Sequence, residues 1–174
     1  MNVGTNTINV KCKSASGSTR TYKLTVVRKE AAKPTGTLSS TKYTVGDKYI
    51  TGITPGTKAS NFLAGLSVDG GTAKLVGANG KQNQGLAATG NKVEVYVDNK
   101  KKTSYEVVIY GDVNGDGEIN VLDMIKVNRH ILGLDKLSGV YLVAADANRK
   151  GDGLNVLDMI YINRHALGLS TIKQ

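Results

Sequence analysis

A fifteen-residue stretch of this sequence occurs twice. Residues 120–134 read NVLDMIKVNRHILGL and residues 155–169 read NVLDMIYINRHALGL, so twelve of the fifteen positions are identical at an offset of 35. An internal repeat this close indicates a duplicated supersecondary unit. In both copies an Asp- and Asn-rich stretch leads into apolar residues at helical spacing, and a glycine stands where a helix would end. The repeat therefore predicts two copies of a loop followed by a helix, with apolar faces formed by Leu122, Ile125, Ile131 and Leu132 and by Leu157, Ile160 and Leu167.

The stretch before the first helix, DVNGDGEINVLD at residues 112–123, has the pattern of a twelve-residue EF-hand calcium loop. Calcium takes roughly six to eight oxygen ligands, and such a loop supplies them from alternate positions around a glycine at position 6. Gly117 holds that position, whereas position 12 is Asp in place of the usual Glu. A metal-free, Asx-rich turn is the alternative. The predicted ligands are Asp112, Asn114, Asp116, the backbone carbonyl of Glu118, Asn120 and Asp123.

The second copy, ADANRKGDGLNVLD at residues 145–158, departs further from this pattern. Its loop has thirteen residues, and Lys150 stands at position 5, where a cation cannot bind calcium. A rearranged loop would use Asp152 as its middle ligand, with the carbonyl of Gly153 in the place of Glu118. A loop without metal remains the alternative here as well. The ligands predicted for a second calcium ion are Asp146, Asn148, Asp152, Gly153, Asn155 and Asp158.

The charge balance changes near Tyr110. Residues 1–110 hold 16 Lys and Arg against 6 Asp and Glu, whereas residues 111–174 hold 7 against 8. A basic first part is compatible with nucleic acid or anionic polymers. Its lysines alternate along predicted strands instead of clustering with aromatic residues, which favours a solvated sheet face and no nucleic-acid partner. No apolar run approaches the roughly 20 residues of a membrane-spanning helix.

Two β-rich segments precede the repeat. Residues 6–28 alternate in the manner of a hairpin, with Cys12 on the inward face, and two strands need a further element to pack on. Residues 31–40 read as a linker. Residues 41–110 predict a small β-sandwich with one short helix, N-capped by Thr57, and a clear hairpin through VEVYVDNKKKTSYEVVI. No Ser/His/Asp, Cys/His or paired-carboxylate arrangement stands outside the loops, so the chain is not expected to be an enzyme.

Two calcium loops, each followed by a helix at this spacing, resemble a dockerin. The openings GDVNGDG and AAD are characteristic, and the first loop follows a predicted strand (VVIYGDVNGDG) without an intervening helix. The resemblance covers residues 111–170. It implies a calcium-dependent module that docks its parent protein onto a cohesin of a scaffoldin or cell-surface protein. It further implies a secreted or cell-surface bacterial location and a carbohydrate-active parent.

The resemblance also implies which residues contact the cohesin. Dockerins use positions 10, 11, 17, 18 and 22 of each repeat, and many have a Ser/Thr pair at the first two. Here that pair is Val-Leu in both copies, which implies a more apolar contact. A duplicated surface would allow two docking orientations related by about 180°. The corresponding residues are Val121, Leu122, Asn128, Arg129 and Gly133 in the first copy and Val156, Leu157, Asn163, Arg164 and Gly168 in the second.

The sequence thus predicts a multidomain chain. Residues 1–32 are similar to the last strands of a cadherin-like or Ig-like β-sandwich, through GSTRTYKLTVVRKE, followed by a linker. Residues 33–110 form a small β-rich module similar to the X-modules that precede dockerins, and residues 111–174 form an all-α dockerin with two EF-hand-like loops. The alternative function is a carbohydrate- or cell-wall-binding β-module with a calcium-stabilised appendage, although the chain has no Trp and one Phe for sugar stacking. Polysaccharide would otherwise be reached through the parent protein.

Overall fold

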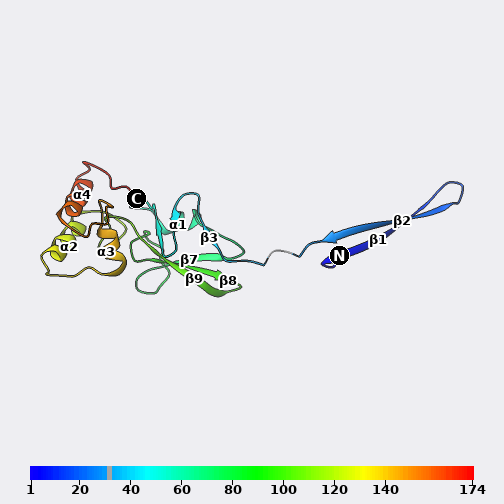
Figure 1. The fold of residues 1–174 in the computed structure, drawn as a ribbon, viewed down its shortest axis with the longest axis horizontal. Helices are drawn as coiled ribbons and strands as arrows, with labels where there is room; N and C mark the ends of the chain where they lie inside the picture. The colour runs from blue at the N-terminus through cyan, green and yellow to red at the C-terminus, as the bar shows by residue number, and fades with distance from the viewer. Residues whose placement is uncertain (31–32) are drawn as a thin grey trace. The chain divides into compact units, whose positions relative to one another are not determined.

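A computed structural model describes residues 1–30 and 33–174 of the chain and divides it into two compact units, Met1–Lys33 and Pro34–Gln174 (Figure 1). The predicted linker begins with Ala31 and Ala32, which lie outside the described residues.

The first unit is the predicted hairpin. Strands β1 (Gly4–Lys13) and β2 (Thr19–Arg28) pair antiparallel, with Ile8 opposite Leu24 and Val10 opposite Tyr22. The apolar face follows from the alternation, but its side chains are exposed. The interpretation of Cys12 as a core residue is wrong, because Cys12 is exposed. Two strands have no second layer, and no described element of this unit covers their apolar face.

The second unit begins with a mainly-β region, which confirms the predicted architecture. A five-stranded sheet has the order β4-β5-β9-β8-β7, with β5 and β9 parallel and the other pairs antiparallel, and a two-stranded sheet joins β3 to β6. The elements are β3 (Leu38–Ser39), β4 (Thr44–Val45), β5 (Tyr49–Thr51), α1 (Ala59–Ala64), β6 (Ser67–Val68), β7 (Thr72–Val76), β8 (Lys92–Val97) and β9 (Lys100–Val107).

The core of this region lies where the sequence alternation places it. Val93 and Val95 of β8 are fully buried, and they share a hydrophobic cluster with Phe62 of α1. The Asp98–Asn99 turn has positive φ at both residues, as the tight hairpin between β8 and β9 requires. The prediction of Thr57 as the N-cap of α1 is wrong, because Lys58 holds that position. The Thr57 hydroxyl donates to the carbonyl of Thr54 at 2.6 Å, and the helix begins one residue later.

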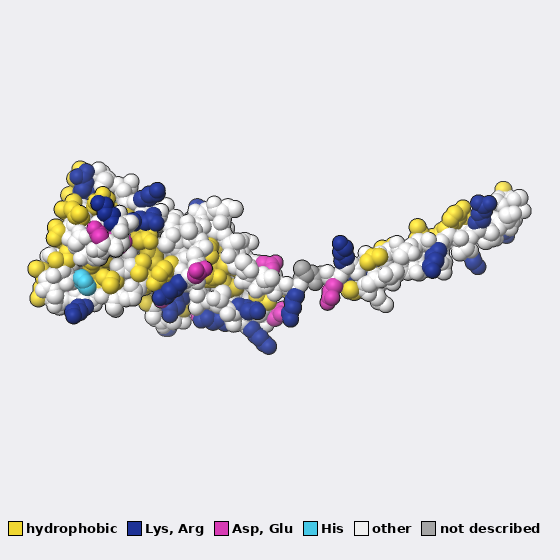
Figure 2. Space-filling model, viewed as in Figure 1, with side chains coloured by type: hydrophobic (Ala, Val, Ile, Leu, Met, Phe, Trp, Pro, Cys, Tyr) yellow, Lys and Arg dark blue, Asp and Glu magenta, His cyan; other side chains and the backbone are white. Residues whose placement is uncertain are grey.

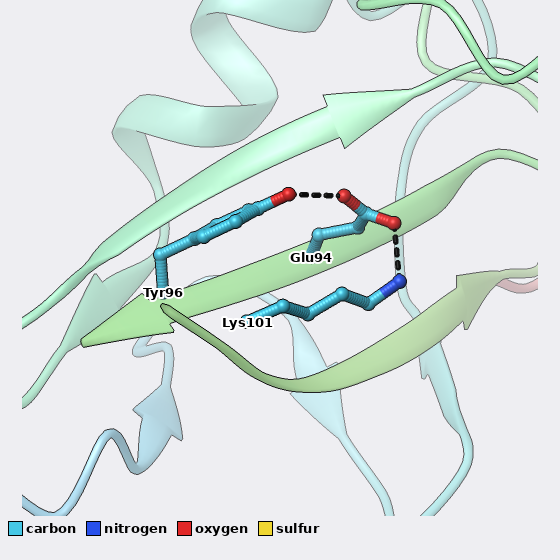
Figure 3. A network of polar contacts seen from close by, with 3 residues as sticks. All are labelled: Glu94, Tyr96 and Lys101. Carbon is cyan, nitrogen blue, oxygen red and sulfur yellow. Dashed lines mark hydrogen bonds and ion pairs between the residues drawn. The ribbon is translucent and has the colours of Figure 1, made fainter. Parts of the chain in front are cut away.

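The opposite face of the sheet is polar and self-paired. Tyr96 donates a hydrogen bond of 2.7 Å to Glu94, and Lys101 pairs with the other oxygen of the same carboxylate (Figure 3). The ammonium of Lys74 lies 4.8 Å from the centroid of the Tyr96 ring. These bonds to Lys101 and Tyr96 lower the pKa of Glu94. The solvated face expected for the lysine-rich strands is therefore present here.

The rest of the unit is helical. The predicted helices are α2 (Val121–Ile131) and α4 (Val156–Ala166), which pack on each other, while α3 (Gly139–Ala145) was not predicted. Asn120 and Asn155 cap α2 and α4 in identical capping boxes with Asp123 and Asp158. No helix in the described part of the chain has the length and apolar character to span a membrane.

The helical and β regions share one hydrophobic cluster. Val127 of α2 and Ile162 of α4 are fully buried in the same cluster as Ile50, Leu75 and Val93 of the sheet. The apolar faces predicted for α2 and α4 do exist, but most of their side chains point outward: Leu122, Ile125, Leu132, Leu157, Ile160 and Leu167 are exposed, and Ile131 is partly buried.

We expect Cys12 to react with a maleimide in the native protein at a rate within about threefold of its rate in denaturant, because its thiol is exposed. The measurement is labelling followed over time by mass spectrometry. A Cys12→Ser chain supplies the background, since Cys12 is the one cysteine of the sequence. Protection of Cys12 until the chain unfolds would contradict the exposed hairpin face.

Candidate metal centre and docking surface

The first loop is built around the buried carboxylate of Asp112. Its Oδ1 accepts backbone N–H groups from Gly115 at 2.8 Å and Asp116 at 3.2 Å, and its Oδ2 accepts from Gly117 at 3.1 Å. A fourth N–H, from Thr89 of the β region, reaches Oδ2 at 2.8 Å. The sequence of the loop alone brings the first three donors together, because the Gly-containing turn wraps around position 1.

Asp123 closes the first loop and starts α2. Its Oδ1 accepts from the backbone N–H of Val113 at 2.8 Å and of Asn114 at 2.9 Å, and its Oδ2 accepts from Asn120 at 2.9 Å. The carboxylate is fully buried. One side chain thus ties the start of the loop to the first turn of the helix, where a negative charge is stabilised by the helix dipole.

Burial and repulsion act together on these carboxyls. Burial, and then the charges of Asp123 and Asp116, raise the pKa of Asp112 to about 6 against the hydrogen bonds that lower it. Burial also raises the pKa of Asp123. Within the described residues, no Lys, Arg or His forms an ion pair with either group. A cluster of this kind fits a divalent cation, which would supply the missing positive charge.

The other predicted ligands of the first loop lie at its rim. Asn114 donates from its amide nitrogen to Asp116 at 2.7 Å, and Asp116 accepts the N–H of Glu118 at 2.9 Å. Asp116 and Glu118 are exposed, whereas Asn120 is half-buried and caps α2. The structure therefore brings Asp112 and Asp123 to the inside of the loop and leaves the middle positions near the solvent.

The second loop gathers three carboxylates. Asp146, Asp152 and Asp158 each offer an oxygen within 4.8 Å of the others, so Asp152, although exposed, lies beside the first and last aspartates of the loop. Lys150, at position 5, contributes only its backbone N–H to Asp146 and Asn148. The amide nitrogen of Asn148 is buried and has no hydrogen-bond partner. Three convergent acidic oxygens fit a calcium ion, whereas the amide nitrogen of Asn148 is a donor and cannot be a ligand.

Asn155 and Gly153 complete the second loop. The amide of Asn155 donates to the carbonyl of Gly153 at 3.0 Å, and its oxygen accepts the N–H of Leu157 at 2.8 Å. Asp158 accepts from Asn148 at 3.1 Å and Asn155 at 3.0 Å, and so repeats the role of Asp123. The inserted residue is absorbed between Gly151 and Leu154, without disturbing the start of α4.

The docking residues implied by the resemblance are exposed in both copies. Val121 and Leu122 expose 52% and 55% of their residue surface, and Val156 and Leu157 expose 53% and 49%. Hydrophobic side chains gather over the region of α2 and α4 (Figure 2). The polar contact residues Asn128, Arg129, Asn163 and Arg164 are exposed as well.

His130 and His165 are structural, a role that sequence reasoning missed. The Nδ1 atom of His130 accepts the N–H of Leu137 at 2.8 Å, and that of His165 accepts the N–H of Ile172 at 3.2 Å. Each histidine thus fixes the segment that follows its helix. An apolar residue seven positions after each NRH triplet was the available signal.

Comparison with known proteins supports the resemblance for the helical region. Residues 110–167 match the family model described as the dockerin type I domain. Searches of curated proteins and of solved structures gave no match. A dockerin domain is a non-catalytic docking module that binds a cohesin, and dockerin domains bind calcium.

We expect Asp152→Asn to weaken calcium binding at the second loop about tenfold or more, because it removes one of three convergent charges. Asp152 is exposed, so the metal-free fold should be unaffected. The measurement is a two-site calorimetric calcium titration. Asp135→Asn, an exposed acidic residue outside both loops, is the control. Unchanged affinity in Asp152→Asn would show that this carboxylate is not a ligand.

Proposed function

We propose that residues 111–174 dock the parent protein onto a cohesin of a scaffoldin or cell-surface protein in a calcium-dependent manner. Residues 33–110 act as a non-catalytic companion module, and the protein works outside the cell. The observation that carries the proposal is the pair of matching exposed surfaces, each directly beside a loop. The first loop buries the carboxylates of Asp112 and Asp123, and the second brings Asp146, Asp152 and Asp158 together.

Calcium ions in the two loops would supply the charge that the buried carboxylates need. The first ion would be held by Asp112, Asn114, Asp116, the carbonyl of Glu118, Asn120 and Asp123, and the second by Asp146, Asn148, Asp152, the carbonyl of Gly153, Asn155 and Asp158. The residues at each end of a loop already accept backbone N–H groups. Metal binding would therefore fix the loops against α2 and α4 and so orient the exposed residues at the helix starts.

The chemistry of the exposed surface suits protein docking. Large apolar side chains that remain half-exposed lose water favourably when a partner covers them. Each Val-Leu pair stands at the start of its helix, two turns before an exposed arginine whose planar guanidinium binds carboxylates through two hydrogen bonds. The proposed contact residues are Val121, Leu122, Asn128, Arg129, Val156, Leu157, Asn163 and Arg164.

The two surfaces are similar but not identical. Arg129 lies 3.9 Å from Asp135, a pair exposed on both sides and therefore weak, whereas the equivalent of Asp135 in the second copy is Ser170. Lys126 is replaced by the exposed Tyr161. Both surfaces can present the shared Val-Leu and Asn-Arg pairs, so a partner could use either one.

The alternative, carbohydrate binding by the β-module, has weaker support. On the polar face of the sheet, Glu94, Tyr96 and Lys101 satisfy one another (Figure 3), so that a sugar would have to displace existing bonds. A pull-down with insoluble polysaccharides, alongside the cohesin experiment, separates the two functions.

The direct test of docking is calorimetric titration of the chain against a panel of cohesins, with calcium and with chelator. We expect at least one cohesin to bind in calcium and to lose most of its affinity in chelator, because the loops orient the docking residues. Absence of calcium-dependent binding across the panel would count against the proposal.

We expect Arg129→Ala alone to weaken cohesin binding by no more than about threefold, since the second surface can replace the first. Arg129→Ala combined with Arg164→Ala should weaken it by about a hundredfold, within the range of interface arginines. Lys126→Ala, which alters an exposed cation that the copies do not share, is the control. If the single substitution already abolished binding, the two surfaces would not be interchangeable.

A further inference from the structure

The two calcium loops share a sequence pattern but differ in their surroundings. The first loop lies against residues 86–91, the segment of the β-module that leads into β8. From Ala87 to Asn91 this segment is buried. The second loop follows α3, and its Gly151, Asp152 and Gly153 are exposed. The two loops differ first in which residues donate backbone N–H groups to the carboxylate at position 1.

Thr89 holds the start of the first loop at two points. Its backbone N–H donates to Oδ2 of Asp112 at 2.8 Å. Its hydroxyl accepts the N–H of Ile109 at 3.1 Å and lies 3.2 Å from the Ile109 carbonyl, to which it donates. Thr89 therefore fixes both the predicted ligand and the backbone three residues before it.

The carboxylates at position 1 of the two loops differ in the number of backbone N–H groups that they accept. Asp112 accepts four backbone N–H groups, one of them from the β-module. Asp146 accepts two, from Lys150 at 3.2 Å and Gly151 at 3.0 Å, both inside its own loop. Asp112 is fully buried, whereas Asp146 is only partly so.

The space around the glycines also differs between the two loops. A Cβ atom on Gly117 would lie 2.7 Å from the carbonyl oxygen of Ala87, and one on Gly115 would lie 2.9 Å from that of Thr89. A Cβ on Gly151 or Gly153 of the second loop would meet nothing within 4 Å. The first loop is thus in backbone contact with the module, which the hydrogen bond from the Gly56 N–H to the Gly117 carbonyl at 2.8 Å reinforces.

We propose that residues 86–91, through Thr89, are a positioning element for the first calcium loop. Calcium in that loop and the folded β-module then stabilise each other, because a coupling between two binding or folding events is reciprocal. The second loop contacts the last residue of the module through the Arg149 guanidinium, 4.6 Å from the centroid of the Tyr110 ring, and takes up calcium without help from residues 86–91. This inference rests on the proposed function in one respect, that calcium is the ligand of both loops.

The test isolates each loop in the full chain. Asp158→Asn leaves the first loop to bind calcium, and Asp123→Asn leaves the second. Thr89→Val keeps the backbone N–H to Asp112 and removes the hydroxyl that bonds Ile109 and so sets the position of that N–H. In the Asp158→Asn chain it should weaken calcium affinity about tenfold, the lower end of the scale for groups that hold a metal ligand in place. In the Asp123→Asn chain, the same substitution should change affinity by less than about threefold. Thr89→Ser keeps the hydroxyl and should restore the first loop. Equal sensitivity of both loops, or none at the first, would overturn the inference.

A second measurement does not depend on how Thr89→Val folds. In the Asp158→Asn chain, added calcium should slow amide hydrogen exchange across β8 and β9, whereas in the Asp123→Asn chain it should not. Exchange that slows equally in both chains, or in neither, contradicts the coupling. Failure of both chains to take up calcium at all would overturn the proposed function and this inference with it. Calcium uptake without the difference between loops overturns the inference alone.

A matched glycine pair adds a third readout. Gly117 and Gly151 occupy the same loop position and both have positive φ, so alanine strains the backbone at either one. Only at Gly117 does the added methyl group meet the β-module. Gly117→Ala should therefore speed exchange in β8 and β9, and Gly151→Ala should leave it unchanged; equal effects would contradict the contact.

Discussion

Three buried carboxylates, those of Asp112, Asp123 and Asp158, determine how the helical region is built. A carboxylate removed from water needs several donors, and here backbone N–H groups from the loops and the helix starts provide them. Each such bond also fixes a turn of the chain. The negative charge that these bonds do not offset favours a bound cation. The loops, the helix caps and the orientation of the outward residues all depend on satisfying these buried carboxylates.

The sequence repeat predicted the helical region well because its signals are local. The loop glycines and the terminal Asp of each loop act within a few residues, and α2 and α4 begin within the loops that these residues mark. The capping role of Asn120 and Asn155 was not predicted, since both were assigned as ligands only. Helix α3 was missed because GVYLVAA is a short apolar run without a cap that bonds through its side chain. The position of Asp152 could only be suggested, since an inserted residue can rearrange a loop in several ways.

Non-local contacts account for the remaining differences. Cys12 was placed in a core because its strand alternates, yet alternation identifies a face and not what covers it. The outward direction of Leu122 and Leu157 depends on which side of each helix meets its neighbour, with Val127 and Ile162 turned inward. The hydrogen bond from the Thr89 N–H to Asp112 joins residues 23 positions apart, and no sequence pattern in either segment predicts it.

The duplicated surface on α2 and α4 has a statistical consequence. If both surfaces dock as proposed, with similar affinity, two ways of forming the complex double the number of bound states, which improves the free energy of binding by about 0.4 kcal/mol at room temperature. A gain so small is within reach of a single added methyl contact. The larger effect of duplication is on the orientation of the bound parent protein. Two docked orientations of nearly equal energy would hold it in opposite directions. Neighbouring proteins on a crowded support could then each adopt the orientation that avoids a steric clash with the next.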